Sequence, residues 1–129
     1  MKKIIPLLMS LLMLAGCAMQ PAAESTYRQI DMDQAISLME TESDYIIVDV
    51  RTLAEYNERH IPGAVNIPNE NIGSEEITEL PDKQQLILVY CRSGNRSKQA
   101  AQKLADMGYT NVVEFGGIND WSGETVSGA

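Results

Sequence analysis

LILVYCRSGNRS, residues 86–97, is the stretch that decides the fold class of this chain. Its first five residues form a continuous apolar run, which is typical of a strand buried on both faces of a sheet. Residues 97–107 then place apolar side chains on one helical face, and Gly108 can end that helix. A buried strand that runs through a short loop into a helix predicts an α/β fold.

The same alternation extends to both sides of this segment. Apolar or β-branched runs predict further strands at residues 27–30, 45–50, 64–67 and 112–115. Strands of this kind, separated by helices, indicate a parallel sheet that is covered on both faces. In such folds, ligands bind where strand C-termini meet helix N-termini.

Three further helix starts follow from capping residues. Asp31 can cap a helix over residues 31–39, and residues 52–55 form a capping box. Ser74, followed by two glutamates, predicts another helix that ends at Pro81.

Composition bounds the class of protein. The chain has 129 residues, of which 44% are hydrophobic and 22% are charged, as in an ordinary globular protein of one domain. Its formal net charge of −8 and its aromatic content of 5% argue against a nucleic-acid partner, which would need a basic and often aromatic surface.

The N-terminus predicts an export signal. Lys2 and Lys3 precede a short apolar stretch at residues 4–15, as in secretory signals. Residues 14–17, LAGC, resemble a bacterial lipobox, which implies cleavage before Cys17 and attachment of lipid to its thiol. We therefore expect a lipid-anchored protein of the bacterial cell envelope that faces outside the cytoplasm. It would lie on the periplasmic face of a membrane, or on the outer surface of a one-membrane cell.

The predicted organisation has four parts. A lipoprotein signal peptide covers residues 1–16, and a small, polar tether covers residues 17–26. One domain covers residues 27–122, and residues 123–129 form a flexible tail.

The loop after the strand at residues 86–90 contains the candidate nucleophile and the candidate anion-binding residues. Cys91 stands at the strand terminus, facing the crevice, and is the one free thiol if Cys17 carries lipid. Gly94 and Asn95 tolerate unusual backbone angles, which lets the loop curl and point its N–H groups at the sulfur. Together with the following helix start, these groups stabilise a thiolate or a bound anion. The anion-binding candidates are Arg92, Ser93, Gly94, Asn95, Arg96 and Ser97.

Three segments, in this order, carry a family pattern. Residues 49–68 contain DVRT, EY and HIPGAVNIP, residues 90–97 read YCRSGNRS, and residues 116–121 read GGINDW. Together they resemble a single rhodanese (sulfurtransferase) domain. The resemblance implies a three-layer α/β sandwich with a central five-stranded parallel sheet.

The resemblance also implies that Cys91 carries a persulfide. Its thiolate would take sulfur from a small anionic donor such as thiosulfate and pass it to cyanide in vitro or a thiol in vivo. Arg92 and Arg96 would hold the dianionic donor, and no metal, nucleotide or other cofactor is required. Asp49 and Arg51 are supporting candidates, because Asp49 could pair with a loop arginine and Arg51 could face the crevice. His60 is expected to order a turn.

Two other functions use similar residues. One is a cysteine-dependent phosphatase or arsenate reductase, but the phosphatases have five residues between cysteine and arginine. Here four residues lie between Cys91 and Arg96, and the narrower loop favours attack on sulfur. The other is a rhodanese-like binding or persulfide-carrier module without independent turnover. The intact Cys91 and its cationic loop count against a module that only binds.

Overall fold

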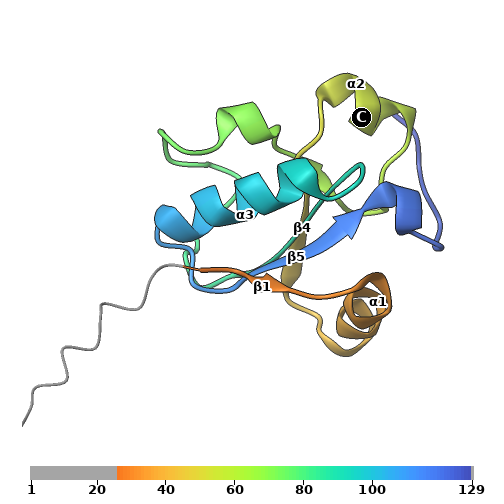
Figure 1. The fold of residues 1–129 in the computed structure, drawn as a ribbon, viewed down its shortest axis with the longest axis horizontal. Helices are drawn as coiled ribbons and strands as arrows, with labels where there is room; N and C mark the ends of the chain where they lie inside the picture. The colour runs from red at the N-terminus through yellow and green to blue at the C-terminus, as the bar shows by residue number, and fades with distance from the viewer. Residues whose placement is uncertain (1–25, 129) are drawn as a thin grey trace, which may run out of the picture.

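The computed structural model describes residues 26–128, which form a five-stranded parallel sheet covered by helices on both faces (Figure 1). The strand order is β1-β5-β4-β2-β3, and every neighbouring pair is parallel. The predicted fold class is therefore confirmed. The strands are β1 (Arg28–Gln29), β2 (Tyr45–Asp49), β3 (Val65–Asn66), β4 (Leu86–Cys91) and β5 (Val112–Gly117).

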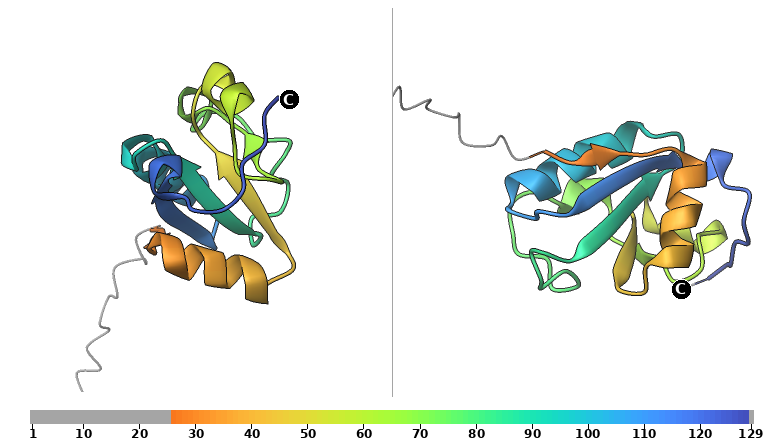
Figure 2. Two further views of the ribbon diagram at one scale, coloured as in Figure 1. Left: turned by 90° about the vertical axis from the view of Figure 1, so that its right-hand side faces the viewer. Right: turned by 90° about the horizontal axis from the view of Figure 1, so that it is seen from below.

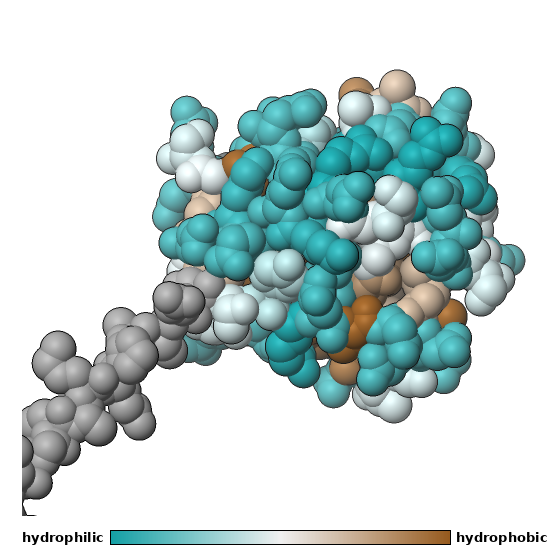
Figure 3. Space-filling view, in the orientation of Figure 1, coloured by the Kyte–Doolittle hydropathy of each residue, from teal (hydrophilic) through white to brown (hydrophobic). Residues whose placement is uncertain are grey.

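Helices lie on opposite faces of this sheet (Figure 2). α3 (Asn95–Asp106) packs on one face, while α1 (Met32–Thr41) packs on the other. α2 (Leu53–Glu58) lies beyond the carboxyl end of β2, and single 3-10 turns occupy Asn69–Asn71 and Ile118–Asp120. Hydrophilic side chains cover the outer face of α3 (Figure 3).

Each face of the sheet has its own apolar core. The α3 side buries Val48, Val89, Cys91 and Leu104, while the α1 side buries Ile47, Leu88, Tyr90 and Phe115. Neighbouring residues of one strand therefore enter different cores, as the alternation of side chains in a strand requires. This alternation places Cys91 under α3 and Tyr90 under the opposite layer.

The predicted helix starts at Asp31 and at residues 52–55 are confirmed. Asp31 Oδ1 accepts a hydrogen bond from Gln34 N–H at 2.8 Å, and Gln34 Oε1 accepts one from Asp31 N–H at 3.0 Å. Thr52 and Glu55 form the same reciprocal pair at the start of α2. Each box satisfies N–H groups that have no partner within the helix.

The helix predicted between Ser74 and Pro81 is wrong. The segment that follows Asn69–Asn71 is irregular, with Ile72, Ile77 and Leu80 buried in the α3-side core. Those three residues are spaced five and three apart, which does not fit one helical stripe. Pro81 also disfavours helical angles at Leu80, which leaves too short a segment to offset helix nucleation.

Residues 126–128, predicted as part of a flexible tail, make hydrogen bonds to the end of α2. Val126 and His60 exchange backbone hydrogen bonds of 2.8 and 2.9 Å. Ser127 Oγ and Gly128 N donate to the carbonyl groups of Glu58 and Asn57. The C-terminus therefore lies beside α2 (Figure 1).

The predicted signal peptide, the tether up to residue 25 and Cys17 lie outside the described residues. Within residues 26–128, none of the helices has the length and apolar character that crossing a membrane requires.

We predict that Gly117→Ala destabilises the domain by about 3 kcal/mol or more, a cost typical of severe overpacking. A Cβ atom at Gly117 would overlap the backbone of Arg92 and Ser93, so the loop after β4 would have to move away from β5. Urea unfolding of the variant and of Ser122→Ala, an exposed control in the next loop, measures the difference. Equal midpoints for the two variants would contradict this close approach.

Candidate active site around Cys91

Cys91 is the last residue of β4, and its sulfur lies beneath the loop that leads to α3. Gly94 N–H donates to Cys91 Sγ at 2.9 Å, and the thiol lies 3.3 Å from Ser97 Oγ, to which it donates. The residue is only 1% exposed. The sulfur therefore lies in the predicted cradle but does not face an open crevice.

The loop between β4 and α3 has three residues, because α3 begins at Asn95, two residues earlier than predicted. Gly94 makes the turn with φ of +113°, a value that residues with a Cβ atom rarely adopt. Asn95 has no positive φ and is the first residue of the helix. Of the two residues predicted to curl the loop, Gly94 alone does so.

Arg96 is held by α2. Its two terminal nitrogens lie 2.6 and 2.9 Å from the carboxylate oxygens of Glu55, a bidentate pair. This hydrogen-bonded pair lowers the pKa of Glu55 from 4.5 to about 2. Arg96, predicted to hold the donor, therefore has its guanidinium engaged by Glu55.

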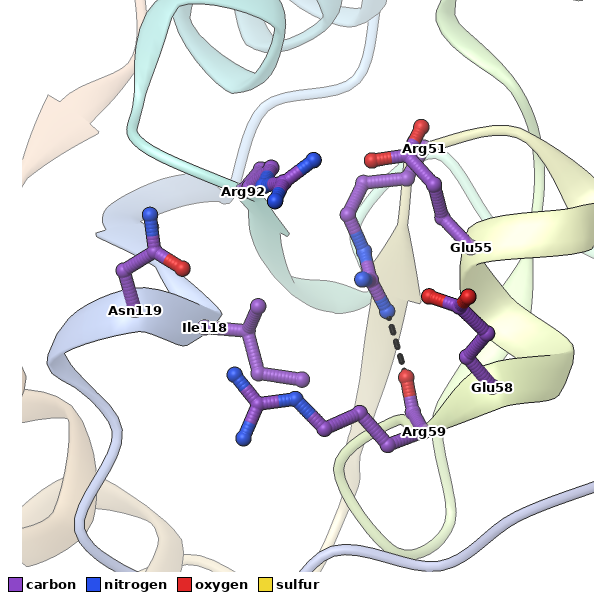
Figure 4. Close-up of a pocket in the computed structure, with 7 residues that line it drawn as sticks. All are labelled: Arg51, Glu55, Glu58, Arg59, Arg92, Ile118 and Asn119. Atoms are coloured by element: carbon purple, nitrogen blue, oxygen red, sulfur yellow. Dashed lines mark hydrogen bonds between the residues drawn. The ribbon is translucent and has the colours of Figure 1, made fainter.

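Arg92 remains exposed and lines a small pocket above the loop (Figure 4). The pocket holds about 60 Å³, far below the roughly 300–1,000 Å³ of sites for drug-sized ligands. A small inorganic ion suits this size. The pocket is lined by Arg51, Glu55, Glu58, Arg59, Arg92, Ile118 and Asn119.

Asp49 pairs with Arg51 and not with a loop arginine. The fully buried Asp49 carboxylate receives hydrogen bonds from Arg51 Nη2 and from the Tyr90 hydroxyl, both at 2.6 Å. Arg51 is itself 4% exposed and also donates to the Arg59 carbonyl at 2.7 Å. Burial, and then the hydrogen bond to Asp49, raise the pKa of Tyr90. Both supporting candidates thus act together in a buried network beside the pocket.

Residues 31–124 match the family described as Rhodanese-like domain. The chain belongs to the rhodanese-like family. The match covers all three layers and the whole Cys91 loop of this rhodanese-like domain.

Curated relatives of this rhodanese-like domain include named sulfurtransferases. Thiosulfate sulfurtransferase PspE of Escherichia coli is 40% identical over 63% of this chain and 78% of PspE. Thiosulfate sulfurtransferase GlpE of Coxiella burnetii is 34% identical over 74% of this chain and 87% of GlpE. Adenylyltransferase and sulfurtransferase UBA4 of Meyerozyma guilliermondii is 38% identical and longer, since the match spans 24% of its length.

Among solved structures, a rhodanese with anions from E. coli superposes with a TM-score of 0.61 and 38% identity. The superposition covers 65% of this chain and 99% of the E. coli rhodanese.

The sequence reasoning missed two parts of this rhodanese-like site. It did not assign Glu55 to Arg96, which lies 41 residues away in the chain. It also overlooked Glu114, a carboxylate in the middle of β5 that is 2% exposed and bonded to Ser97. A charged residue inside the apolar run VVEF was the available signal, because a buried charge requires partners. His60, expected to order a turn, has Nδ1 2.8 Å from the Tyr56 carbonyl oxygen in α2.

We predict that Arg96→Ala moves the pKa of Glu55 from about 2 back toward 4.5, because its main hydrogen-bond partner is lost. A lowered carboxyl pKa stabilises the fold above pH 4.5, and this contribution disappears as the pH falls toward 2. The variant should therefore lose stability at neutral pH and depend less on pH in the acid range. Carboxyl NMR titration and acid unfolding, with Lys98→Ala as control, measure both effects. An unchanged Glu55 titration would contradict the pairing.

Proposed function

We propose that this rhodanese-like domain is a thiosulfate sulfurtransferase in which Cys91 carries the transferred sulfur as a persulfide. One observation carries the proposal: Cys91 Sγ accepts the Gly94 N–H at 2.9 Å directly at the start of α3. An N–H group and the positive end of a helix stabilise a sulfur anion, which is the nucleophile in sulfur transfer.

The reaction proceeds in two displacements at sulfur. The Cys91 thiolate attacks the outer sulfur of thiosulfate, the bond between the two thiosulfate sulfurs breaks, and sulfite leaves with that electron pair. Cys91 then carries a terminal sulfur with one negative charge. An acceptor thiolate or cyanide attacks this terminal sulfur and releases the Cys91 thiolate.

The pocket above the loop offers a site for the dianionic donor. Arg92 and Arg59 both line it, and neither side chain takes part in an ion pair with another described residue. Arg51 lines it too but is committed to Asp49. We therefore assign donor binding to Arg92 and Arg59, and we assign to Arg96 the positioning of the loop against α2.

Two alternatives are weaker. A phosphatase needs room for a tetrahedral phosphate around the cysteine, and a three-residue connection with a buried sulfur leaves little. A carrier that hands sulfur to one partner protein needs a sulfur that a protein thiol can reach. The 1% exposure of Cys91 favours small donors and acceptors.

We further propose that lipid on Cys17 attaches the domain to a membrane outside the cytoplasm. The support is the LAGC sequence at residues 14–17 after a charged and apolar start. Metabolic labelling with a fatty acid should label the chain and spare its Cys17→Ser variant. Equal labelling of both would refute the anchor.

The persulfide is tested by mass spectrometry of the full chain after exposure to thiosulfate. We expect one added sulfur atom on Cys91, thiocyanate production when cyanide follows, and neither in Cys91→Ser. Absence of an adduct on the unaltered chain, with no thiocyanate, would refute the proposed transfer. Hydrolysis of a generic phosphate ester, lost in Cys91→Ser, would favour the phosphatase.

We predict that Arg92→Ala and Arg59→Ala each raise the KM for thiosulfate about 10-fold or more, because a charge-assisted hydrogen bond contributes about 1.5–3 kcal/mol. Lys98→Ala, an exposed cation on α3, should leave the KM unchanged. Steady-state kinetics at several salt concentrations provides the measurement. Equal KM values for all three variants would show that neither Arg92 nor Arg59 binds the donor.

A further inference from the structure

Glu114 is a buried acid that the two displacements at sulfur do not use. It lies on the α3 face of β5, 2% exposed, and within the described residues no lysine, arginine or histidine approaches its carboxylate within 4.0 Å. Its Oε1 atom accepts hydrogen bonds from Ser97 Oγ at 2.7 Å and from Gly116 N at 2.8 Å. A carboxylate anion without a cation is costly at such a site.

Ser97 connects this acid to the reactive sulfur. Ser97 is fully buried, and its hydroxyl lies 3.3 Å from Cys91 Sγ on one side and 2.7 Å from Glu114 Oε1 on the other. The same hydroxyl has two other acceptors, the carbonyls of Gly94 at 3.0 Å and Gly116 at 3.3 Å. The contact with Glu114 is the shortest of the set, so the single hydroxyl proton points to the acid when the acid is ionised.

The hydrogen-bonded series Cys91–Ser97–Glu114 can hold its two protons in two arrangements. In the first, the Cys91 thiol donates to Ser97 and the Ser97 hydroxyl donates to an ionised Glu114. In the second, a neutral Glu114 donates to Ser97 and the hydroxyl donates to a Cys91 thiolate. Both keep the hydrogen bonds from Cys91 to Ser97 and from Ser97 to Glu114, with the donors exchanged, and they differ only in which end of the series holds the acidic proton.

We propose that Glu114 is a positioning residue that holds, through Ser97, the proton that Cys91 gives up when it becomes a nucleophile. This inference rests on the proposed function, since it assigns the fate of a proton in that reaction. The thiolate has the Gly94 N–H and the α3 N-terminus, whereas the Glu114 anion has two hydrogen bonds and no cation. The second arrangement therefore places the negative charge on the sulfur, beside the Gly94 N–H and the start of α3.

The steps balance in atoms and charge. In the first displacement the thiol proton moves to Ser97, the Ser97 proton moves to Glu114, and the sulfur attacks thiosulfate as sulfite departs. The products are the Cys91 persulfide anion, neutral Glu114 and sulfite. In the second displacement the acceptor removes the terminal sulfur, and the released Cys91 sulfur recovers the proton from Glu114 through Ser97.

The charge around the sulfur thus stays constant through the cycle. Glu114 is neutral while the persulfide anion is present, so the two do not repel each other. The other charged groups around this loop are Arg92 on the loop, Arg96 on α3 and Glu55 on α2, and the last two neutralise each other. Within the described residues, neither Arg92 nor Arg96 hydrogen-bonds to Glu114, which leaves Ser97 as its link to the sulfur.

The test is a pH titration of the ultraviolet absorbance of the thiolate in the full chain, with Cys91→Ser subtracted as the baseline. Because Cys91 and Glu114 share a proton, the thiolate should appear in two steps in the unaltered chain. Glu114→Gln keeps the shape of the side chain but cannot take the proton, so it should give one step. Turnover with thiosulfate at neutral pH should fall on the order of 10²-fold, as expected for loss of a proton acceptor.

Two further variants separate a proton acceptor from a structural carboxylate. Ser97→Ala removes the hydroxyl between Cys91 and Glu114, so the thiolate should again appear in one titration step. Glu76→Gln, an exposed control, should keep two titration steps. Urea unfolding of each variant shows that the fold is retained. One step in the unaltered chain, at the same pH as in Glu114→Gln, would overturn the inference. The titration does not depend on whether thiosulfate adds sulfur to Cys91. That addition is a separate experiment and tests the proposed function.

Discussion

The three-residue connection between β4 and α3 is the constraint on which the site depends. A strand and a helix that meet over so short a distance force the first free N–H groups of the helix onto the end of the strand. The positive φ of Gly94 makes this turn, and the bond from its N–H to Cys91 Sγ is the result. The close approach of Gly117 to the Arg92 carbonyl closes the same turn from the β5 side.

The arginines near the site divide into two kinds, and pairing with a carboxylate separates them. Arg51 and Arg96 each meet a carboxylate, and they hold β2 to its own loop and α3 to α2. Arg92 and Arg59 come from different loops, are exposed, and border one pocket of ionic size. Arg51 lines the same pocket but is paired with Asp49, whereas Arg92 and Arg59 take part in no ion pair with another described residue.

Local sequence predicted those parts of the fold that depend on neighbouring residues. The five strands, the capping residues at Asp31 and Thr52 and the short loop after β4 all follow from periodicity or from residues three or four apart. The segment after Asn71 is not the predicted helix, because burial of Ile72, Ile77 and Leu80 in the core outweighed the local helix signal of Ser74 and the two glutamates that follow it. The partners of Arg96 and Ser97 lie 41 and 17 residues away, and only the folded chain brings them together.

The depth of Cys91 has a consequence for the lifetime of its reduced state. A thiol with 1% of its surface exposed meets bulky disulfides and glutathione-like oxidants rarely, and the described domain offers no second cysteine to form an internal bridge. Oxidative loss of the sulfur would then depend on brief openings of the loop and not on the reactivity of the thiolate. The depth of the sulfur thus protects its reduced state, with no second thiol in the described domain.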